Sequence, residues 1–126
     1  CFGIYVRGDQ SAYVATLKDE AIMGKLAADH SADWQKLDVA VLHRLVFDHL
    51  LAPKFGGTDK LAIRYTPRAG DAFDAVHEAG ATLAFLMRPT RMDQVETIAG
   101  HGELLPQKST FFYPKLLTGL VMTLLD

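Results

Sequence analysis

Residues 81–87 read Ala-Thr-Leu-Ala-Phe-Leu-Met, a run in which Thr82 is the one polar residue. A short run that is apolar on both faces is typical of a strand covered on both sides, and we therefore expect it to be central in its sheet. Before it, Asp71 is placed to cap a helix and Gly80 to end that helix, and residues 61–65 form a further short strand candidate. Strand, helix and strand in so few residues predict a right-handed crossover.

The chain begins with two other β-rich runs, residues 2–7 and 12–17. Between them lies Gly8-Asp9-Gln10-Ser11, a turn-rich tetrapeptide with the length of a hairpin loop, so we predict an antiparallel pair. No initiator Met and no signal-like segment stands before the first run. We therefore expect the chain to be the C-terminal part of a longer parent protein.

Two helices are predicted after this pair, because apolar residues recur there at helical spacing. The first is short, with Asp19 as its cap, and should end near His30. The second is longer, and either Ser31 or Asp33 can cap it. Its broad apolar face, which includes Trp34, is expected to pack in the core.

Proline, glycine and threonine residues indicate where the long helix ends and where a later helix begins and ends. Pro53 and the pair Gly56-Gly57 should end the long helix. Thr90 is placed to cap a later helix that Gly100 should end. Residues 116–125 are apolar enough for a last strand, which we favour, although periodicity leaves a buried helix open.

The composition fits one domain. The chain has 126 residues, of which 49% are hydrophobic and 22% charged. We expect a single α+β domain over residues 1–126, with about four helices packed on a mainly antiparallel or mixed sheet. A net charge of -2 and a pI near 6.2 make no positive field that would attract nucleic acid. One cysteine, and no apolar run near the roughly 20 residues of a membrane span, predict a cytoplasmic protein without a membrane partner.

Residues 106–115 read Pro-Gln-Lys-Ser-Thr-Phe-Phe-Tyr-Pro-Lys and combine cations, hydroxyls and aromatic rings. From Gly102 onward the sequence is close to a Walker phosphate loop, but Gln107 stands where that pattern needs glycine. Pro106 has no N–H to offer a phosphate, and the aromatic residues that follow are unlike the helix that a Walker loop opens. The sequence therefore argues against a backbone phosphate cradle.

The side chains of this stretch remain candidates for an anion site. Lysine ammonium groups suit phosphate or carboxylate, and hydroxyl groups can donate hydrogen bonds to the same anion. The candidates are Lys108, Ser109, Thr110 and Lys115. The alternative is a polar loop beside an aromatic edge strand.

Other polar residues carry weaker signals. His43 and His49 flank Asp48, but a spacing of six residues matches no zinc pattern on a helix, so structural roles are favoured and no metal site is expected. Asp38 is either a solvated carboxylate in the first turn of a helix or a group that points into a cleft.

Several stretches, in their order and spacing, resemble the C-terminal part of a bacterial and archaeal family catalogued as domain of unknown function 1015. They are residues 37–45, 63–65, 80–90 and 105–116, with Gly119-Leu120-Val121. The string at residues 106–115 is the most specific of them, and family members often carry Met where Leu105 stands. Full members are longer, and their N-terminal part carries a histidine–glutamate motif that this chain lacks.

The resemblance implies a function. Relatives share a ParB-like catalytic architecture, and some resemble free-serine kinases, which transfer a nucleotide phosphoryl group to the hydroxyl of L-serine. The parent protein would then be a small-molecule phosphotransferase that uses ATP or ADP with Mg²⁺, while this chain holds no cofactor and is inactive alone. The phosphate contacts expected in it are Lys108, Ser109, Thr110, Lys115 and Arg88.

The same resemblance implies the partners. They are a small-molecule substrate and the missing N-terminal domain, which would supply the catalytic base. Apart from the resemblance, a homodimer is a further possibility. Two alternatives stay open at this point. One is a non-catalytic ParB-like module that binds nucleotide or nucleic acid, and the other is a purely structural domain.

Overall fold

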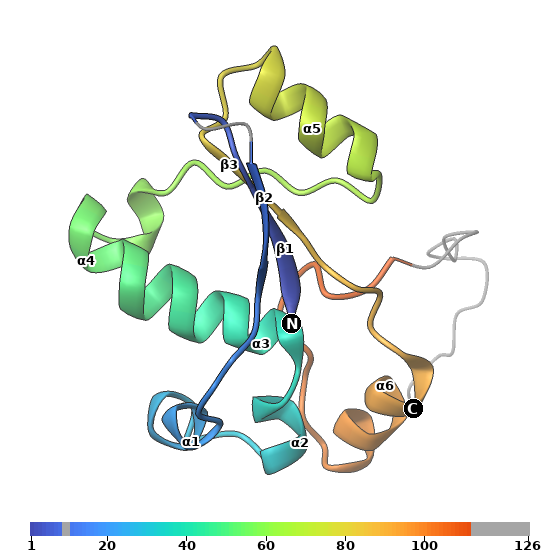
Figure 1. The fold of residues 1–126 in the computed structure, drawn as a ribbon. Helices are drawn as coiled ribbons and strands as arrows, with labels where there is room; N and C mark the ends of the chain where they lie inside the picture. The colour runs from blue at the N-terminus through green and yellow to red at the C-terminus, as the bar shows by residue number, and fades with distance from the viewer. Residues whose placement is uncertain (9–10, 112–126) are drawn as a thin grey trace, which may run out of the picture.

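The computed structural model describes residues 1–8 and 11–111 (Figure 1). Within them the chain forms a three-stranded antiparallel sheet surrounded by helices, so the predicted α+β class is confirmed. The strands are β1 (Phe2–Val6), β2 (Ser11–Ala15) and β3 (Leu83–Leu86), in the order β2-β1-β3. The strand predicted over residues 116–125 lies outside the described residues.

The hairpin of β1 and β2 is the antiparallel pair that the sequence predicts. Phe2 lies opposite Ala15 in this pair. On its other side β1 pairs with β3, where Gly3 lies opposite Leu86. A Cβ atom added at Gly3 would lie 3.2 Å from Cβ of Leu86, so glycine lets the two strands approach closely here.

The sheet order places β1 in the centre and β3 at an edge, so the central position predicted for residues 81–87 is wrong in the described part of the chain. The apolar run arises because both faces of β3 are covered. On one face the ring of Phe85 lies with its centroid 5.5 Å from that of Phe47. On the other face helix α5 (Ala69–His77) packs with Val76 fully buried. Among the described residues, β3 is thus covered on both faces while one of its edges has no strand partner.

Residues 61–65 form no strand, so the predicted crossover is also wrong. A 3₁₀ turn, η2 (Thr58–Lys60), is followed by irregular chain in which Leu61 and Ile63 pack on the core. Leu61 and Ile63 alternate with polar or smaller residues because this segment lies along the core, where every second side chain packs inward, although the segment pairs with no strand. β3 instead joins β1 in an antiparallel arrangement.

The long helix predicted after Ser31 is broken near its start. The Ser31 hydroxyl accepts a hydrogen bond of 3.2 Å from the backbone N–H of Trp34, and so caps α2 as predicted. The helical segments are α2 (Ala32–Gln35), α3 (Asp38–Ala40), the π-helix η1 (Val41–Leu51) and α4 (Ala52–Phe55), and the last three are continuous. Gly56, with φ of 82°, ends them as predicted. Pro53 does not end them, because the helical segment continues through it to Phe55; Pro53 lies where the π-helix η1 changes into α4.

The remaining helices differ from prediction in their boundaries. The two not yet described are α1 (Ala21–Leu26) and α6 (Met92–Gly100). Asp19 accepts a hydrogen bond of 2.9 Å from a backbone N–H of α1, as a cap does, although this helix is shorter than predicted. Asp71 lies inside the first turn of α5 rather than at its cap, because that helix begins two residues earlier. α6 ends at Gly100, as predicted.

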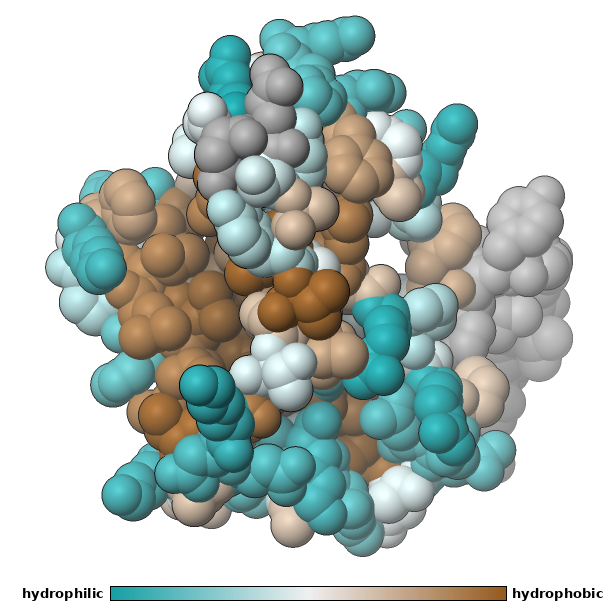
Figure 2. Space-filling model, in the orientation of Figure 1, coloured by the Kyte–Doolittle hydropathy of each residue, from teal (hydrophilic) through white to brown (hydrophobic). Residues whose placement is uncertain are grey.

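The core lies between the sheet and the helices that surround it (Figure 1). Met23 and Ile98 are almost completely buried, and Trp34, at 4% exposure, lies in the core as predicted. Figure 2 shows hydrophobic residues gathered over the side of the molecule where η1 and α4 lie, and Leu50 and Phe55 of these helices are exposed. Within the described ranges, no helix has the length and apolar character needed to cross a membrane.

Candidate functional site

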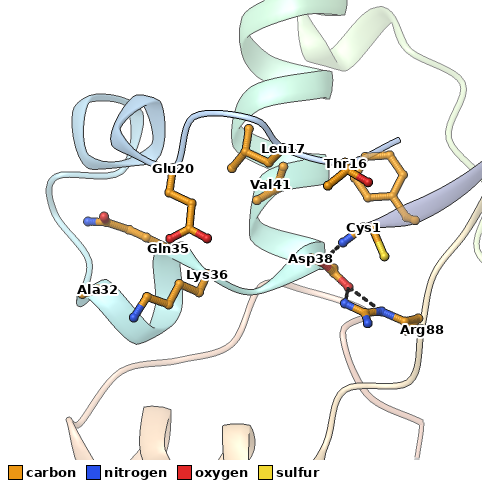
Figure 3. Close-up of a pocket in the computed structure, with 11 residues that line it drawn as sticks. Cys1, Thr16, Leu17, Glu20, Ala32, Gln35, Lys36, Asp38, Val41 and Arg88 are labelled. Carbon is orange, nitrogen blue, oxygen red and sulfur yellow. Dashed lines mark hydrogen bonds and ion pairs between the residues drawn. The ribbon is translucent and has the colours of Figure 1, made fainter. Parts of the chain in front are cut away.

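A cavity of about 330 Å³ lies beside the start of β1, the end of β2, and helices α2 and α3 (Figure 3). Phe2, Leu17 and Val41 supply apolar surface to it. Its polar lining consists of Cys1, Thr16, Glu20, Gln35, Lys36, Asp38 and Arg88. This cavity, which we call the Asp38 pocket, therefore presents both signs of charge beside an apolar surface.

Asp38 and Arg88 meet in the wall of this pocket. Arg88, which follows β3, donates to Oδ2 of Asp38 from Nε at 3.0 Å and from Nη2 at 2.6 Å. The other carboxylate oxygen, Oδ1, accepts from the N-terminal ammonium of Cys1 at 2.6 Å. Nη1 of Arg88 has no hydrogen-bond partner among the residues that the structure describes. Asp38 thus orients a guanidinium that keeps donors available.

The surroundings of Asp38 keep it ionised. Burial would raise the pKa of Asp38, but hydrogen bonds and charge from the Cys1 ammonium and Arg88 outweigh that effect, so its pKa lies below the ordinary value of 3.8. Its side chain is 23% exposed and lines the pocket. Of the two alternatives that the sequence left open for Asp38, the structure therefore supports the carboxylate that points into a cleft.

Lys36 and Glu20 supply a second group of charges to the same pocket. Figure 3 shows them with Gln35 on the side away from Asp38 and Arg88, and no ion pair joins them to another residue drawn there. The sequence reasoning did not single out these residues. The signal that could have found them is a second helix start soon after Ser31: Asp38, an acidic residue of the kind that favours the first turn of a helix, indicates two helices joined near Lys36 rather than one long helix.

The loop with the predicted anion-binding residues lies beside the segment that carries Arg88. The hydroxyl of Thr90 donates a hydrogen bond of 2.8 Å to the backbone carbonyl oxygen of Ser109. Thr90 is therefore engaged with this loop. The prediction that Thr90 caps α6 is wrong. Arg91 is the residue at that cap position, and its backbone N–H donates to Oε1 of Gln94 at 3.1 Å.

The predicted site residues differ in what they can offer a ligand. Lys108 and Thr110 are exposed, and Lys108 makes no ion pair within the described ranges. Lys108 also has a left-handed φ of 61°, which is uncommon for a residue with a side chain. The hydroxyl of Ser109 donates to the carbonyl oxygen of Pro106, so it is already engaged. Lys115 lies outside the described residues.

The structure brings some of these residues close in the fold but does not join them all. Arg88 lines the Asp38 pocket, and Thr90, two residues further on, holds the backbone of Ser109. No hydrogen bond between Arg88 and the side chains of Lys108 or Thr110 is formed in the described part of the chain. Arg88 and the loop thus supply cations from neighbouring segments.

The histidines of the long helix do not form a metal site in the described part of the chain, where no three His, Cys, Asp or Glu side chains come together as ligands. His43 is half-buried on η1, and burial lowers its pKa more than the charge of Asp48 raises it. At neutral pH the His43 imidazole is therefore uncharged.

Comparison with protein-family models, curated proteins and solved structures gives no match to the chain. The resemblance to the domain family accordingly rests on the sequence motifs, and the functions that it implies stay predictions.

Proposed function

We propose that the chain is the C-terminal domain of a small-molecule phosphotransferase, in which the Asp38 pocket and the loop at Lys108 form one wall of the site. The observation that carries the proposal is the position of Arg88. Asp38 fixes its guanidinium in the wall of a pocket with both signs of charge, while Thr90 fastens the Lys108 loop to the next stretch of chain.

The Asp38 pocket suits a small zwitterion such as the free amino acid serine. Arg88 and Lys36 can bind a carboxylate, and Glu20 can bind an ammonium group. The volume of about 330 Å³ is at the small end of ligand pockets, which fits a compact substrate. Because Arg88 is held in place by Asp38 before the substrate arrives, less side-chain freedom is lost on binding.

The Lys108 loop suits the phosphoryl group. Phosphoryl transfer depends mainly on positioning and on stabilisation of negative charge, and Lys108 and Thr110 are an exposed cation and an exposed hydroxyl. In the proposed reaction the substrate hydroxyl oxygen forms a bond to phosphorus, while the bond from phosphorus to the leaving oxygen of ATP or ADP breaks. The hydroxyl proton passes to a base in the upstream part of the parent protein. We assign no described residue to Mg²⁺, since none of their carboxylates and imidazoles form a ligand cluster.

Titration of the chain with O-phospho-L-serine and L-serine, followed by amide NMR, tests this proposal. We expect saturable shifts near Lys36, Arg88 and Lys108. Lys108→Ala should weaken O-phospho-L-serine binding about tenfold and leave L-serine binding unchanged, because an ionic hydrogen bond contributes roughly 1.5–3 kcal/mol. Lys60→Ala is the matched control, since Lys60 is an exposed lysine whose ion-pair partner among the described residues is Asp59. The absence of binding, or equal effects of the two substitutions, would overturn the proposal.

A second candidate is a structural role for the Asp38–Arg88 pair, and the two-nitrogen contact between them favours it. In that case Arg88 serves to join the end of β3 to the start of α3. Arg88→Gln would then lower the free energy of unfolding without changing the affinity for O-phospho-L-serine. A loss of that affinity in a variant that folds normally would exclude a purely structural role.

A further inference from the structure

A second cavity of about 330 Å³ lies between η1, the irregular segment before α5, and residues 106–107. We call it the Tyr65 pocket. It shares no lining residue with the Asp38 pocket. Trp34, His43, Tyr65 and Pro106 form its flat and apolar walls, and Arg44, Asp48 and Gln107 bring polar groups to it.

Two of the rings in this pocket are nearly parallel. The planes of His43 and Tyr65 differ by 16°, and their ring centroids are 6.3 Å apart. The stacked rings of His30 and Trp34, by comparison, have centroids 3.7 Å apart. His43 and Tyr65 are therefore not in full face-to-face contact, and each keeps ring surface available to a flat ligand. His43 is held in position by an edge contact with Phe47, at 5.2 Å between centroids.

Groups that can form hydrogen bonds in the plane of a bound ring lie beside these surfaces. The side-chain amide of Gln107 bonds to no other residue in the described ranges, and it offers both donors and an acceptor. The indole N–H of Trp34 is already used, because it donates to the carbonyl oxygen of Leu104 at 3.0 Å. That bond also fixes the segment that carries Gln107.

The pocket is lined by one charged group of each sign, Arg44 and Asp48. Arg44 donates to Asp29 at 3.1 Å and lies over the ring of Trp34, with its guanidinium carbon 6.0 Å from the ring centroid. Asp48 accepts a hydrogen bond of 3.0 Å from the hydroxyl of Thr58. Because the two lining charges are opposite, the pocket has no excess of either sign, and a ligand that fits it is an uncharged ring with its own hydrogen-bonding atoms.

We infer that the Tyr65 pocket binds a flat heteroaromatic ring of the nucleobase class, stacked on Tyr65 and His43 and hydrogen-bonded by Gln107. Aromatic side chains stack on any base face, and a side-chain amide matches the donor and acceptor edge of a base. A purely apolar ring would leave the Gln107 amide without a partner. The inference does not rest on the proposed phosphotransferase function, because it uses a different cavity and different side chains.

Titration of the chain with adenosine tests the inference, with Trp34 as a built-in probe because it is the sole tryptophan. We expect saturable quenching of its fluorescence at millimolar adenosine and amide shifts near His43, Tyr65 and Gln107. Tyr65→Leu should weaken binding about tenfold, since base stacking on an aromatic ring contributes roughly 1–3 kcal/mol. Gln107→Ala, at an exposed position, should weaken it about fivefold.

Tyr13→Leu is the matched control, because Tyr13 and Tyr65 are both 51% exposed and Tyr13 does not line this pocket. Adenosine affinity should be unchanged in that variant, and also in Arg88→Gln. Benzyl alcohol, a ring without nitrogen atoms, should bind at least tenfold more weakly than adenosine. The inference is overturned if adenosine gives no saturable signal, or if Tyr13→Leu and Tyr65→Leu weaken adenosine binding equally. It is also overturned if benzyl alcohol binds as tightly as adenosine.

Discussion

Arg88 and Asp38 are 50 residues apart in the sequence, and in the structure Nη2 of Arg88 lies 2.6 Å from Oδ2 of Asp38. The contact joins the end of the edge strand β3 to the first residue of α3, and it forms part of the wall of the Asp38 pocket. Its two residues differ in environment, because the Asp38 side chain is 23% exposed and that of Arg88 is 67% exposed. Asp38 is therefore the fixed partner, and Arg88 is the one that a ligand can reach.

Asp38→Asn removes the charge of this contact and keeps the shape of the side chain. We expect the free energy of unfolding to fall by about 0.5–1 kcal/mol, which is modest because solvent screens the exposed guanidinium. Urea denaturation measures this change. Asp29→Asn is the control, because Asp29 also pairs with an arginine but is 64% exposed. An equal loss of unfolding free energy in the two variants would show that the partial burial of Asp38 does not strengthen its ion pair with Arg88.

The stability that Asp38 contributes should depend on pH in the acid range. Because its pKa in the folded protein lies below 3.8, the contribution is fully present above that pH. It should disappear as the pH falls from 3.8 through the lower folded pKa, since the unfolded chain takes up the proton first. Unfolding free energies of the wild type and Asp38→Asn should therefore converge in strong acid. A difference that stays constant down to the lowest pH would contradict the lowered pKa.

His43 should give a second pH dependence, nearer neutrality. Its pKa in the folded protein is lowered by burial from 6.5, so below 6.5 the unfolded chain binds a proton that the folded protein does not. Stability should accordingly fall as the pH falls from 6.5 towards the lower folded pKa. His43→Gln should make this fall less steep, which melting temperatures over a pH series would show. Identical slopes in wild type and variant would contradict the burial of this ring.

Gly56 ends the long helical segment with φ of 82°, where a Cβ atom is disfavoured. Gly56→Ala should lower the free energy of unfolding by about 1 kcal/mol. Gly100→Ala is the matched control, since Gly100 is the last residue of α6, has no strained φ, and has open space around it. That control should be neutral or stabilise by up to about 1 kcal/mol in the same denaturant series. A neutral Gly56→Ala would contradict the left-handed helix end.

Local features of the fold were predictable from the sequence. The β1–β2 hairpin follows from two alternating runs around a short turn, and caps such as Ser31 and Gly56 act through contacts within a few residues. The place of residues 81–87 in the sheet was not predictable. Apolar residues on both sides of a strand report which faces are covered, but they carry no information about which edges are paired.

The candidate site was predictable only in part. Arg88 and Lys108 were named from motifs, but the partner of Arg88 is far away in the sequence and no periodic pattern connects the two. The Asp38 pocket depends on the corner between α2 and α3, which a continuous apolar pattern conceals. The Tyr65 pocket combines residues of four segments, namely α2, η1, the chain before α5 and residues 106–107, and the same apolar and aromatic residues would equally fit a closed core.

We propose that Arg88, while held by Asp38, still binds the anionic group of a ligand in the Asp38 pocket. The side-chain Nε–H signal of Arg88, followed by ¹⁵N NMR during a titration with O-phospho-L-serine, tests this role most directly. We expect a saturable shift of this signal that matches the binding curve of the backbone amides, together with weaker binding in Arg88→Gln. A signal that stays unchanged while the ligand binds, or wild-type affinity in a folded Arg88→Gln variant, would rule out this role of Arg88.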